Sequence, residues 1–247
     1  MSKPPQELVI GRKGLTDLLK SDPKLIDIIY VQESSKFDIE LDQLLSLATC
    51  KKVNNEFLDK LSDGINHQGV IAQVKPKASF TLEDLIEKAS SGRKLLLGID
   101  QIQDPHNLGA VLRVADAMGV DGLFKTERHC ASEHSATVTK TSCGASHFVP
   151  IATVNNLASS IKTLKKEGFW IVGSSLDSSS IEISTLDANR PIVLILGGED
   201  KGMRKQTQEL CDYLVHIPML GRIQSLNVST ASSILLYEIN RLRSEGC

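Results

Sequence analysis

Two kinds of hydrophobic pattern alternate along this chain of 247 residues. Short, almost continuously apolar runs predict buried strands, and stretches in which apolar residues recur every three or four positions predict amphipathic helices. In the C-terminal part, the runs predict strands at Leu95–Asp100, Gly122–Lys125, Phe148–Ile151, Phe169–Gly173, Ile192–Leu196 and Tyr213–Pro218. The patterns between them predict helices at Leu108–Met118, Asn156–Glu167, Arg204–Leu210 and Val228–Arg243. Such alternation indicates an α/β fold with a mostly parallel sheet that is covered on both faces.

A smaller α/β unit is expected before this part. Its patterns predict helices at Gly11–Lys20, Leu41–Ala48 and Asn55–Leu61 and strands at Ile26–Val31 and Gly69–Val74. The segment Pro76–Ser79 is the expected boundary, because proline removes a backbone donor and small polar residues follow it. Thr81, with Asp84 three residues later, predicts the start of a short helix that reaches Ala89. We therefore expect domains at residues 1–75 and 94–247, joined by a linker at 76–93.

Composition narrows the class of protein further. With 28 Lys and Arg against 30 Asp and Glu, the formal charge is −2, so binding to a nucleic acid would need a local basic patch. The five cysteines, Cys50, Cys130, Cys143, Cys211 and Cys247, form no C-x-x-C, which signals neither a disulfide framework nor a zinc ribbon. No apolar run approaches the roughly 18 residues of a membrane span, and the N-terminus lacks a hydrophobic signal core. A cytoplasmic protein that does not enter membranes is expected.

Several common catalytic motifs are absent from the sequence. There is no G-x-G-x-x-G after the first strand of the large domain, no P-loop and no G-x-S-x-G. An ordinary Rossmann site, a P-loop NTPase and an α/β-hydrolase are therefore not supported. His129, Cys130 and His134 lie close together, but no fourth ligand is nearby, so no metal site is expected.

The first of three unusual segments, Asp104–Arg113, follows a predicted strand and opens a helix. Asn107 is placed to cap that helix, and Gly109 allows close approach of a ligand or another backbone. Arg113 lies six positions beyond Asn107, so both side chains are expected to border one pocket. The alternative is that Asn107 is only a cap and Arg113 only a solvated side chain.

Two further segments also follow predicted strands. Gly197–Met203 begins with paired glycines, and its acidic Glu199 disfavours a phosphate and suits hydroxyls, an amine or a sulfonium. An ordinary turn is the alternative there. The third segment, Ile217–Asn227, enters a helix whose first turns carry several small hydroxyl residues, Ser229, Thr230, Ser232 and Ser233. These residues favour either a backbone-rich cleft or a tight contact between helices.

Taken together, the three segments resemble the three motifs of the SpoU (TrmH) family of SPOUT-superfamily RNA ribose 2′-O-methyltransferases. Motif one matches Asn107–Arg113, motif two matches Leu196–Glu199 with Gly202, and motif three matches Ile217–Met219 with Ser225–Ser229. With Lys140–Ala145, the resemblance covers essentially all of residues 94–247. The N-terminal unit, with Gly11-Arg12 and Asn66–Val70, resembles the family's substrate-binding domain, which is similar to ribosomal protein L30e. The combination is most like the bacterial members that methylate a guanosine in the peptidyl-transferase loop of 23S rRNA.

The resemblance implies a SPOUT-type sheet with a C-terminal trefoil knot, a homodimer and S-adenosylmethionine as cofactor. By analogy, Gly197, Ile217 and Leu226 contact the cofactor, mainly through backbone groups. The family's catalytic arginine matches Arg113, and Asn107, Glu199, Ser225 and Asn227 would hold it and the ribose in place. Because the pKa of arginine lies above 12, we expect Arg113 to orient the target phosphate and stabilise alkoxide charge. The general base stays unassigned.

Two departures from the family pattern are local. Glu199-Asp200-Lys201-Gly202 replaces a shorter Glu-Gly, and Ser233 stands where relatives often carry glycine. Basic residues in both domains are candidates for RNA contact: Arg12, Lys13, Lys51, Lys52, Lys125, Arg128 and Lys140. A tRNA ribose methyltransferase and a catalytically silent RNA-binding factor of ribosome assembly remain the alternatives.

Overall fold

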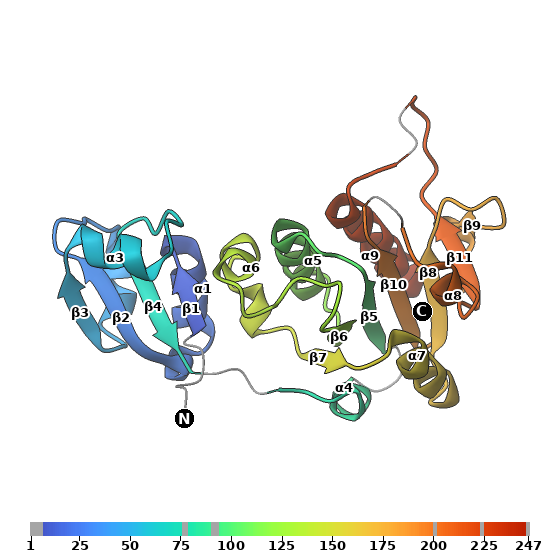
Figure 1. Ribbon diagram of the computed structural model, residues 1–247, viewed down its shortest axis with the longest axis horizontal. Helices are drawn as coiled ribbons and strands as arrows, with labels where there is room; N and C mark the ends of the chain where they lie inside the picture. Colours follow the sequence, from blue (N-terminus) through green and yellow to red (C-terminus); the bar gives the residue numbers. More distant parts are fainter. Residues whose placement is uncertain (1–6, 76–78, 90–93, 200–201, 223–224, 246–247) are drawn as a thin grey trace. The chain divides into compact units, whose positions relative to one another are not determined.

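The computed structural model describes residues 7–75, 79–89, 94–199, 202–222 and 225–245, and these residues form two compact units (Figure 1). The first unit combines Met1–Ala78 with Glu133–Phe148, and the second combines Ser79–Ser132 with Val149–Cys247. The boundary expected at Pro76–Ser79 falls largely outside the described residues.

The first unit is built on a four-stranded sheet. Its strands are β1 (Glu7–Ile10), β2 (Ile26–Gln32), β3 (Cys50–Val53) and β4 (Val70–Val74), in the spatial order β1-β4-β2-β3. Strand β4 is antiparallel to β1 and β2, whereas β2 and β3 are parallel. Its helices and short 3-10 turns are α1 (Arg12–Ser21), η1 (Pro23–Leu25), α2 (Ile39–Leu45), α3 (Asn55–Leu61), α6 (Ala136–Thr141) and η2 (Ala145–His147).

Two apolar clusters hold this unit together. Leucines of α1 and α2 pack with Ile29 and Ala72 of the sheet, and Leu58 of α3 packs with Ile10 and Ile71. Because neighbouring residues of a strand face opposite sides, Ile71 and Ala72 place these clusters on the two faces of the sheet. The three helices predicted from the sequence are therefore the ones that supply the core.

The second unit is built on a seven-stranded, wholly parallel sheet in the order β7-β6-β5-β10-β8-β11-β9. The strands are β5 (Leu95–Asp100), β6 (Gly122–Thr126), β7 (Ile151–Val154), β8 (Trp170–Ser174), β9 (Ile181–Glu182), β10 (Ile192–Gly197) and β11 (Tyr213–His216). The helices and one 3-10 turn are α4 (Leu82–Lys88), α5 (Pro105–Ala117), α7 (Leu157–Lys166), η3 (Ile183–Thr185), α8 (Lys205–Gln208) and α9 (Val228–Glu245). The predicted parallel α/β architecture is confirmed.

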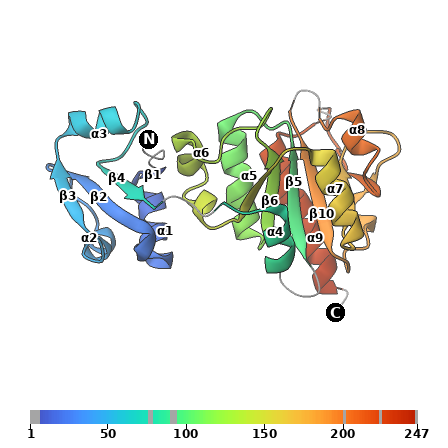
Figure 2. The ribbon, with the colours of Figure 1, turned by 60° about the horizontal axis from the view of Figure 1, so that its bottom comes forward.

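Helices cover both faces of the large sheet. Leu82 and Leu85 of α4 and Leu157, Ile161 and Leu164 of α7 share one buried cluster with Leu96 and Val193. Figure 2 shows α4 and α7 in front of the sheet and α9 behind it, where α9 packs against α5. The capping box predicted at Thr81 and Asp84 is present and begins α4.

The strand order reverses direction between β5 and β10. From β5 the chain proceeds outward through β6 and β7, whereas β8 and β11 lie beyond β10 on the other side. Ligands of open parallel sheets bind at the carboxyl ends of strands where the order reverses in this way. The ends of β5 and β10 are therefore the expected place for a site.

One predicted strand is shifted in the structure. The strand expected at Phe148–Ile151 begins instead at Ile151, because Phe148 packs against the core of the first unit. The 3-10 turn η2, which ends at His147, directly precedes Phe148. The hydrophobic pattern alone did not distinguish Phe148, a partly buried residue that packs on the first unit, from the strand residues of the second unit.

Candidate active site

The backbone crosses itself closely at the carboxyl end of β10. Gly197 pairs in register with Asp100 at the end of β5, and the amide of Gly202 donates to the carbonyl of Gly198 at 3.0 Å. A Cβ on Gly197 would lie 2.2 Å from the carbonyl carbon of Gly202 and from the nitrogen of Met203. Glycine at position 197 is therefore required by the approach of the chain's own backbone.

A buried carboxylate fixes the far end of this loop. Asp100 is almost fully buried, and it accepts hydrogen bonds from the backbone nitrogen of Arg204 at 3.0 Å and from its Nε at 2.8 Å. Gln208 adds a bond from its Nε2 to the carbonyl of Met203 at 3.0 Å. The segment that re-enters after the loop is thus tied both to β5 and to α8.

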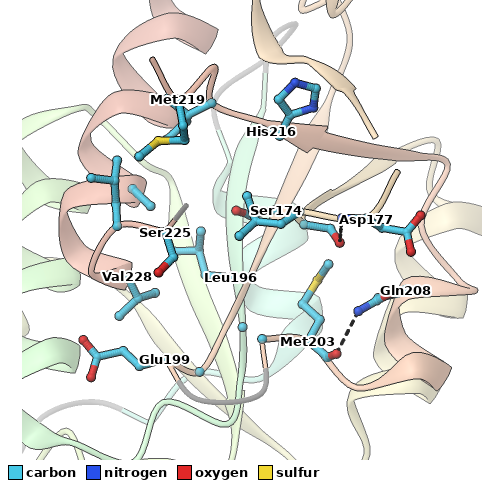
Figure 3. A pocket seen from close by; sticks show the side chains of 18 residues that line it. Ser174, Asp177, Leu196, Glu199, Met203, Gln208, His216, Met219, Ser225 and Val228 are labelled. Atoms are coloured by element: carbon cyan, nitrogen blue, oxygen red, sulfur yellow. Dashed lines mark hydrogen bonds between the residues drawn. The ribbon is translucent and has the colours of Figure 1, made fainter. Parts of the chain in front are cut away.

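Beside the loop lies a cavity of about 500 Å³, within the range of about 300–1000 Å³ found for small-molecule sites (Figure 3). Its walls come from the ends of β8, β10 and β11 and from the segment that leads into α9. Figure 3 shows Glu199, Ser225 and Met219 along one side and Ser174, Asp177 and Gln208 along the other. All three residues predicted to contact a cofactor, Gly197, Ile217 and Leu226, line this cavity.

A chain of amide and carboxylate groups joins the three sequence motifs. Nδ2 of Asn227 donates to Oδ1 of Asn107 at 2.9 Å and also bonds to Oε1 of Glu199. Oδ1 of Asn227 accepts from the amide and the hydroxyl of Ser229, at 2.9 and 2.6 Å, where α9 begins. Asn227 thereby caps a helix and holds Glu199 and Asn107 in one cluster.

Asn107 does not cap a helix, contrary to the sequence-based expectation. Helix α5 begins two residues earlier, with Pro105 in its first turn and Asp104 accepting from the amide of His106 at 2.9 Å. Proline is favoured at that position because its missing N–H is not needed there. Asn107 lies inside the first turn, 8% exposed, with its side chain bonded to Asn227.

Arg113 is exposed on α5 and lines neither this cavity nor the neighbouring one, so the expectation that it shares a pocket with Asn107 is not met within the described residues. Six residues of a helix turn through about 240° beyond one full revolution, which directs the two side chains to different faces. The assignment of Arg113 to catalysis stays a prediction.

Several residues that line the cavity were missed in the sequence. Ser174, Asp177, Gln208 and His216 belong to it, and Ser174 ends β8 while His216 ends β11. The sequence held a signal for Ser174, which directly follows the strand predicted at Phe169–Gly173, whereas His216 lay inside the strand predicted at Tyr213–Pro218. Hydrogen bonds from Ser179 hold the pKa of the Asp177 carboxyl below its usual value, so this side chain stays anionic at neutral pH.

The cavity carries two carboxylates and an apolar lining. Leu196, Met203, Ile217 and Met219 supply apolar surface, while Glu199 and Asp177 supply negative charge. An anionic phosphate would be repelled there, and a cationic ligand with an apolar ring would be attracted. A nucleoside bearing a sulfonium, such as S-adenosylmethionine, fits this combination of surfaces.

The basic residues proposed for RNA contact have different environments. In the first unit, Arg12 donates to Gln68 from its amide (3.0 Å, to Oε1) and from Nε (3.1 Å, to the carbonyl oxygen), and Lys140 donates to the carbonyl of Asn66 at 3.0 Å. Both therefore frame the turn at residues 66–69. Lys125 is only 2% exposed on β6, so its proposed contact with RNA is wrong.

The part of the chain that the structure describes holds neither a candidate metal site nor a candidate membrane span. No group of three or more His, Cys, Asp or Glu side chains there is arranged to hold a metal ion. Within the same residues, no helix combines the length and apolarity needed to cross a membrane. Burial raises the pKa of the Cys211 thiol to about 12, which leaves it protonated and unreactive at neutral pH.

The fold and the joined motifs define a family. Residues 94–237 match the model of the SpoU rRNA Methylase family, and residues 8–80 match the model described as RNA 2′-O ribose methyltransferase substrate binding. The chain belongs to the SpoU rRNA methylase family.

Particular relatives sharpen this placement. The chain is 38% identical over 246 residues to the 23S rRNA (guanosine-2′-O-)-methyltransferase RlmB of Pseudomonas aeruginosa. The alignment covers 96% of this chain and 97% of the relative. The SpoU methyltransferase AviRb of Streptomyces viridochromogenes, solved with AdoMet, has a TM-score of 0.79 at 24% identity and covers 98% and 92% of the two chains. The A. aeolicus TrmH/SpoU tRNA modifying enzyme is 32% identical over 67% of this chain and 82% of its own, with a TM-score of 0.56.

Proposed function

We propose that this protein transfers a methyl group from S-adenosylmethionine to the ribose 2′-hydroxyl of a guanosine in the peptidyl-transferase loop of 23S rRNA. The observation that carries the proposal is the Asn107–Asn227–Glu199 cluster at the wall of a cavity suited to a cationic nucleoside. The relatives described as RlmB support the ribosomal target, and the substrate-binding match in residues 8–80 supports an RNA partner.

The cavity residues would hold the cofactor, which supplies an electrophilic methyl group on its sulfonium when bound. Gly197, Ile217 and Leu226 offer backbone groups, and Leu196 and Met203 offer an apolar surface for a flat ring. Gly197 and Gly198 are where the chain's own backbone comes close: a Cβ on Gly197 would meet Gly202 and Met203, and a Cβ on Gly198 would meet the carbonyl oxygen of Gln101 at 2.5 Å. Glu199 and the anionic Asp177 favour positive charge in the cavity.

The remaining site residues position the ribose. Asn107 and Glu199 present polar groups whose geometry is fixed by Asn227, so little reorganisation is needed when a hydroxyl arrives. Arg113, exposed on α5, would bind the phosphate beside the target ribose and stabilise the alkoxide as its proton leaves. Most of the rate enhancement would come from alignment of two bound reactants.

A second copy of the chain is part of the proposal. Two apolar side chains of α9, Ile234 and Tyr237, are 38% and 60% exposed and lie three positions apart, on one side of the helix. We infer that α9 contributes to a homodimer interface and that the chain after β10 forms the trefoil knot typical of the family. Ribosomal RNA as the substrate also implies action in the cytoplasm.

Two measurements test the proposed function. Calorimetry with S-adenosylhomocysteine should show binding in a 1:1 ratio per chain, which a silent RNA-binding relative need not show. Ribose methylation should be mapped in total RNA from cells with and without the gene. Without it, one guanosine of the peptidyl-transferase loop should lack its 2′-O-methyl group. If methylation were lost only at a tRNA position, the ribosomal target would be wrong, but the proposed reaction, ribose 2′-O-methylation, would still hold.

A further inference from the structure

A second cavity, of about 530 Å³, adjoins the cofactor cavity. Four residues belong to both cavities: Gly198, Glu199, Gly202 and Val228. Asn107, which bonds to Asn227, lines only the second one. Two cavities of similar size therefore share part of their lining, and the proposed ribose-positioning residues Glu199 and Asn107 lie where they meet.

The lining of the second cavity is polar. Besides the shared wall, it presents Gln101, Gln103, Asp104, Asn107 and His129, with Ile102 as the apolar exception beside them. These side chains offer both donors and acceptors, as a nucleobase edge requires. With Asp104 and Glu199 both in the lining, a phosphate is a poor occupant.

The segments that carry these side chains are held in place before any ligand binds. The amide of Ala131 donates to the carbonyl of Ile102 at 2.8 Å, which ties the His129 loop to the segment after β5. Gln101 and His129 both adopt left-handed backbone conformations, with φ of 73° and 65°. Non-glycine residues in that region carry strain, and such strain is concentrated at functional sites.

We propose that the second cavity holds the base of the target nucleoside, and that Asp104 reads the Watson–Crick edge of a guanine there. This inference rests on the proposed function, because it places the ribose of that nucleoside at Asn107 and Glu199. One carboxylate oxygen of Asp104 accepts from the amide of His106 at 2.9 Å, and the carboxylate has a second oxygen for a ligand. Guanine presents the donors N1–H and N2–H2 on this edge, whereas adenine presents an acceptor at N1, which a carboxylate cannot pair with.

His129 and Gln103 complete the recognition. Both line the same cavity as Asp104, and their side chains can donate hydrogen bonds to the acceptors O6 and N7 of the base. Because Asp104 caps α5 and Asn107 lies in the first turn of that helix, the base-reading and ribose-positioning groups share one rigid element. A base that does not pair with Asp104 would therefore leave its ribose out of line with the cofactor cavity.

Asp104→Asn is the sharpest test, because asparagine caps a helix as well as aspartate does and keeps its size. Methyl transfer would be measured on a fragment of the peptidyl-transferase loop that carries either guanosine or inosine at the target; inosine lacks only the N2 amino group. The unaltered protein should prefer guanosine by about tenfold or more in kcat/KM. Asp104→Asn should bring this ratio close to one, while its affinity for S-adenosylhomocysteine stays within about twofold of the original.

Asp187→Asn is the matched control, since Asp187 is an exposed carboxylate that also accepts from a backbone amide and lines neither cavity. It should leave the guanosine preference unchanged. His129→Ala should lower kcat/KM on the guanosine fragment without weakening S-adenosylhomocysteine binding.

A binding measurement separates this inference from the proposed function. With S-adenosylhomocysteine present, guanosine 5′-monophosphate should shift the NMR signal of the His129 ring, identified by its loss in His129→Ala, more than adenosine 5′-monophosphate does. If the protein methylates no rRNA fragment but this shift occurs and is lost in Asp104→Asn, the proposed function fails and the base pocket stands. An unshifted His129 signal, or an Asp104→Asn variant that keeps the original guanosine preference, overturns the base pocket.

Discussion

At the scale of single residues, the site depends on side chains whose partners are distant in the sequence. Asn227 is the clearest case, because its amide nitrogen serves Asn107 and Glu199 while its oxygen caps α9. The sequence indicated all three residues through the family motifs. Their hydrogen bonds could not be derived from the sequence, since the local pattern carries no information on contacts between residues 120 positions apart.

Asn227→Asp should disable methyl transfer without unfolding the protein. The carboxylate keeps the acceptor for the amide of Ser229, but it loses both donors and places a negative charge beside Glu199. Displacement of site groups by about 1 Å can cost about 10²-fold in rate, so kcat should fall by about that factor. Single-turnover kinetics and a thermal melt measure the two effects; a large drop in Tm with normal kcat would contradict the assigned role.

Arg113→Ala should abolish methylation and leave the affinity for S-adenosylhomocysteine nearly unchanged. The affinity should persist because Arg113 is exposed on α5 and lines neither cavity, and methylation should be lost because the variant lacks the proposed contact with the phosphate beside the target ribose. Calorimetry and a methylation assay on the same preparation check both halves of the prediction. A tenfold or larger loss of affinity for S-adenosylhomocysteine would show that Arg113 helps to bind the cofactor and that the role proposed for it is wrong.

At the scale of elements, the sheet positions the site through the ends of β5 and β10. Most helices and buried strands of both units were predictable, because apolar runs and amphipathic periodicity reflect burial directly. Strand β3, with its exposed Lys51 and Lys52, and the threonine-rich α6 were not predicted, since neither shows a hydrophobic pattern of its own. The position of β10 between β5 and β8 is also invisible to any local pattern.

Arg204→Ala should weaken cofactor binding through the loop after β10. The variant loses the bond from Nε to Asp100 but keeps the backbone bond, so the buried carboxylate retains one donor. Because the arginine side chain is 42% exposed, we discount the pair for solvent and expect a cost of about 1 kcal/mol, or about fivefold in Kd. Titration of S-adenosylhomocysteine measures it, and Arg204→Lys should recover part of the loss; equal affinities for all three proteins would exclude a positioning role.

At the scale of the whole molecule, the exposed Ile234 and Tyr237 of α9 form the surface on which the proposed homodimer rests. Tyr237→Asp should convert the proposed homodimer to a monomer, because it would put an unpaired charge into the proposed interface. Light scattering after size-exclusion chromatography gives the mass, and circular dichroism should be unchanged. Ser244→Asp, at an exposed position near the end of the same helix, is the control and should remain dimeric. If the Tyr237→Asp protein kept the mass of the dimer, this face of α9 would not be the dimer interface.

The wall formed by Gly198, Glu199, Gly202 and Val228 has a thermodynamic consequence because it is common to two cavities. An occupant that displaces or stiffens this partition on one side alters the free energy of the occupant on the other. Linkage requires the effect to be equal in both directions, so the donor and the acceptor nucleoside must promote, or oppose, each other's binding by the same factor. A wall that both cavities share, with its Glu199 bonded to Asn227, thus couples the affinities of the two nucleosides whichever of them binds first.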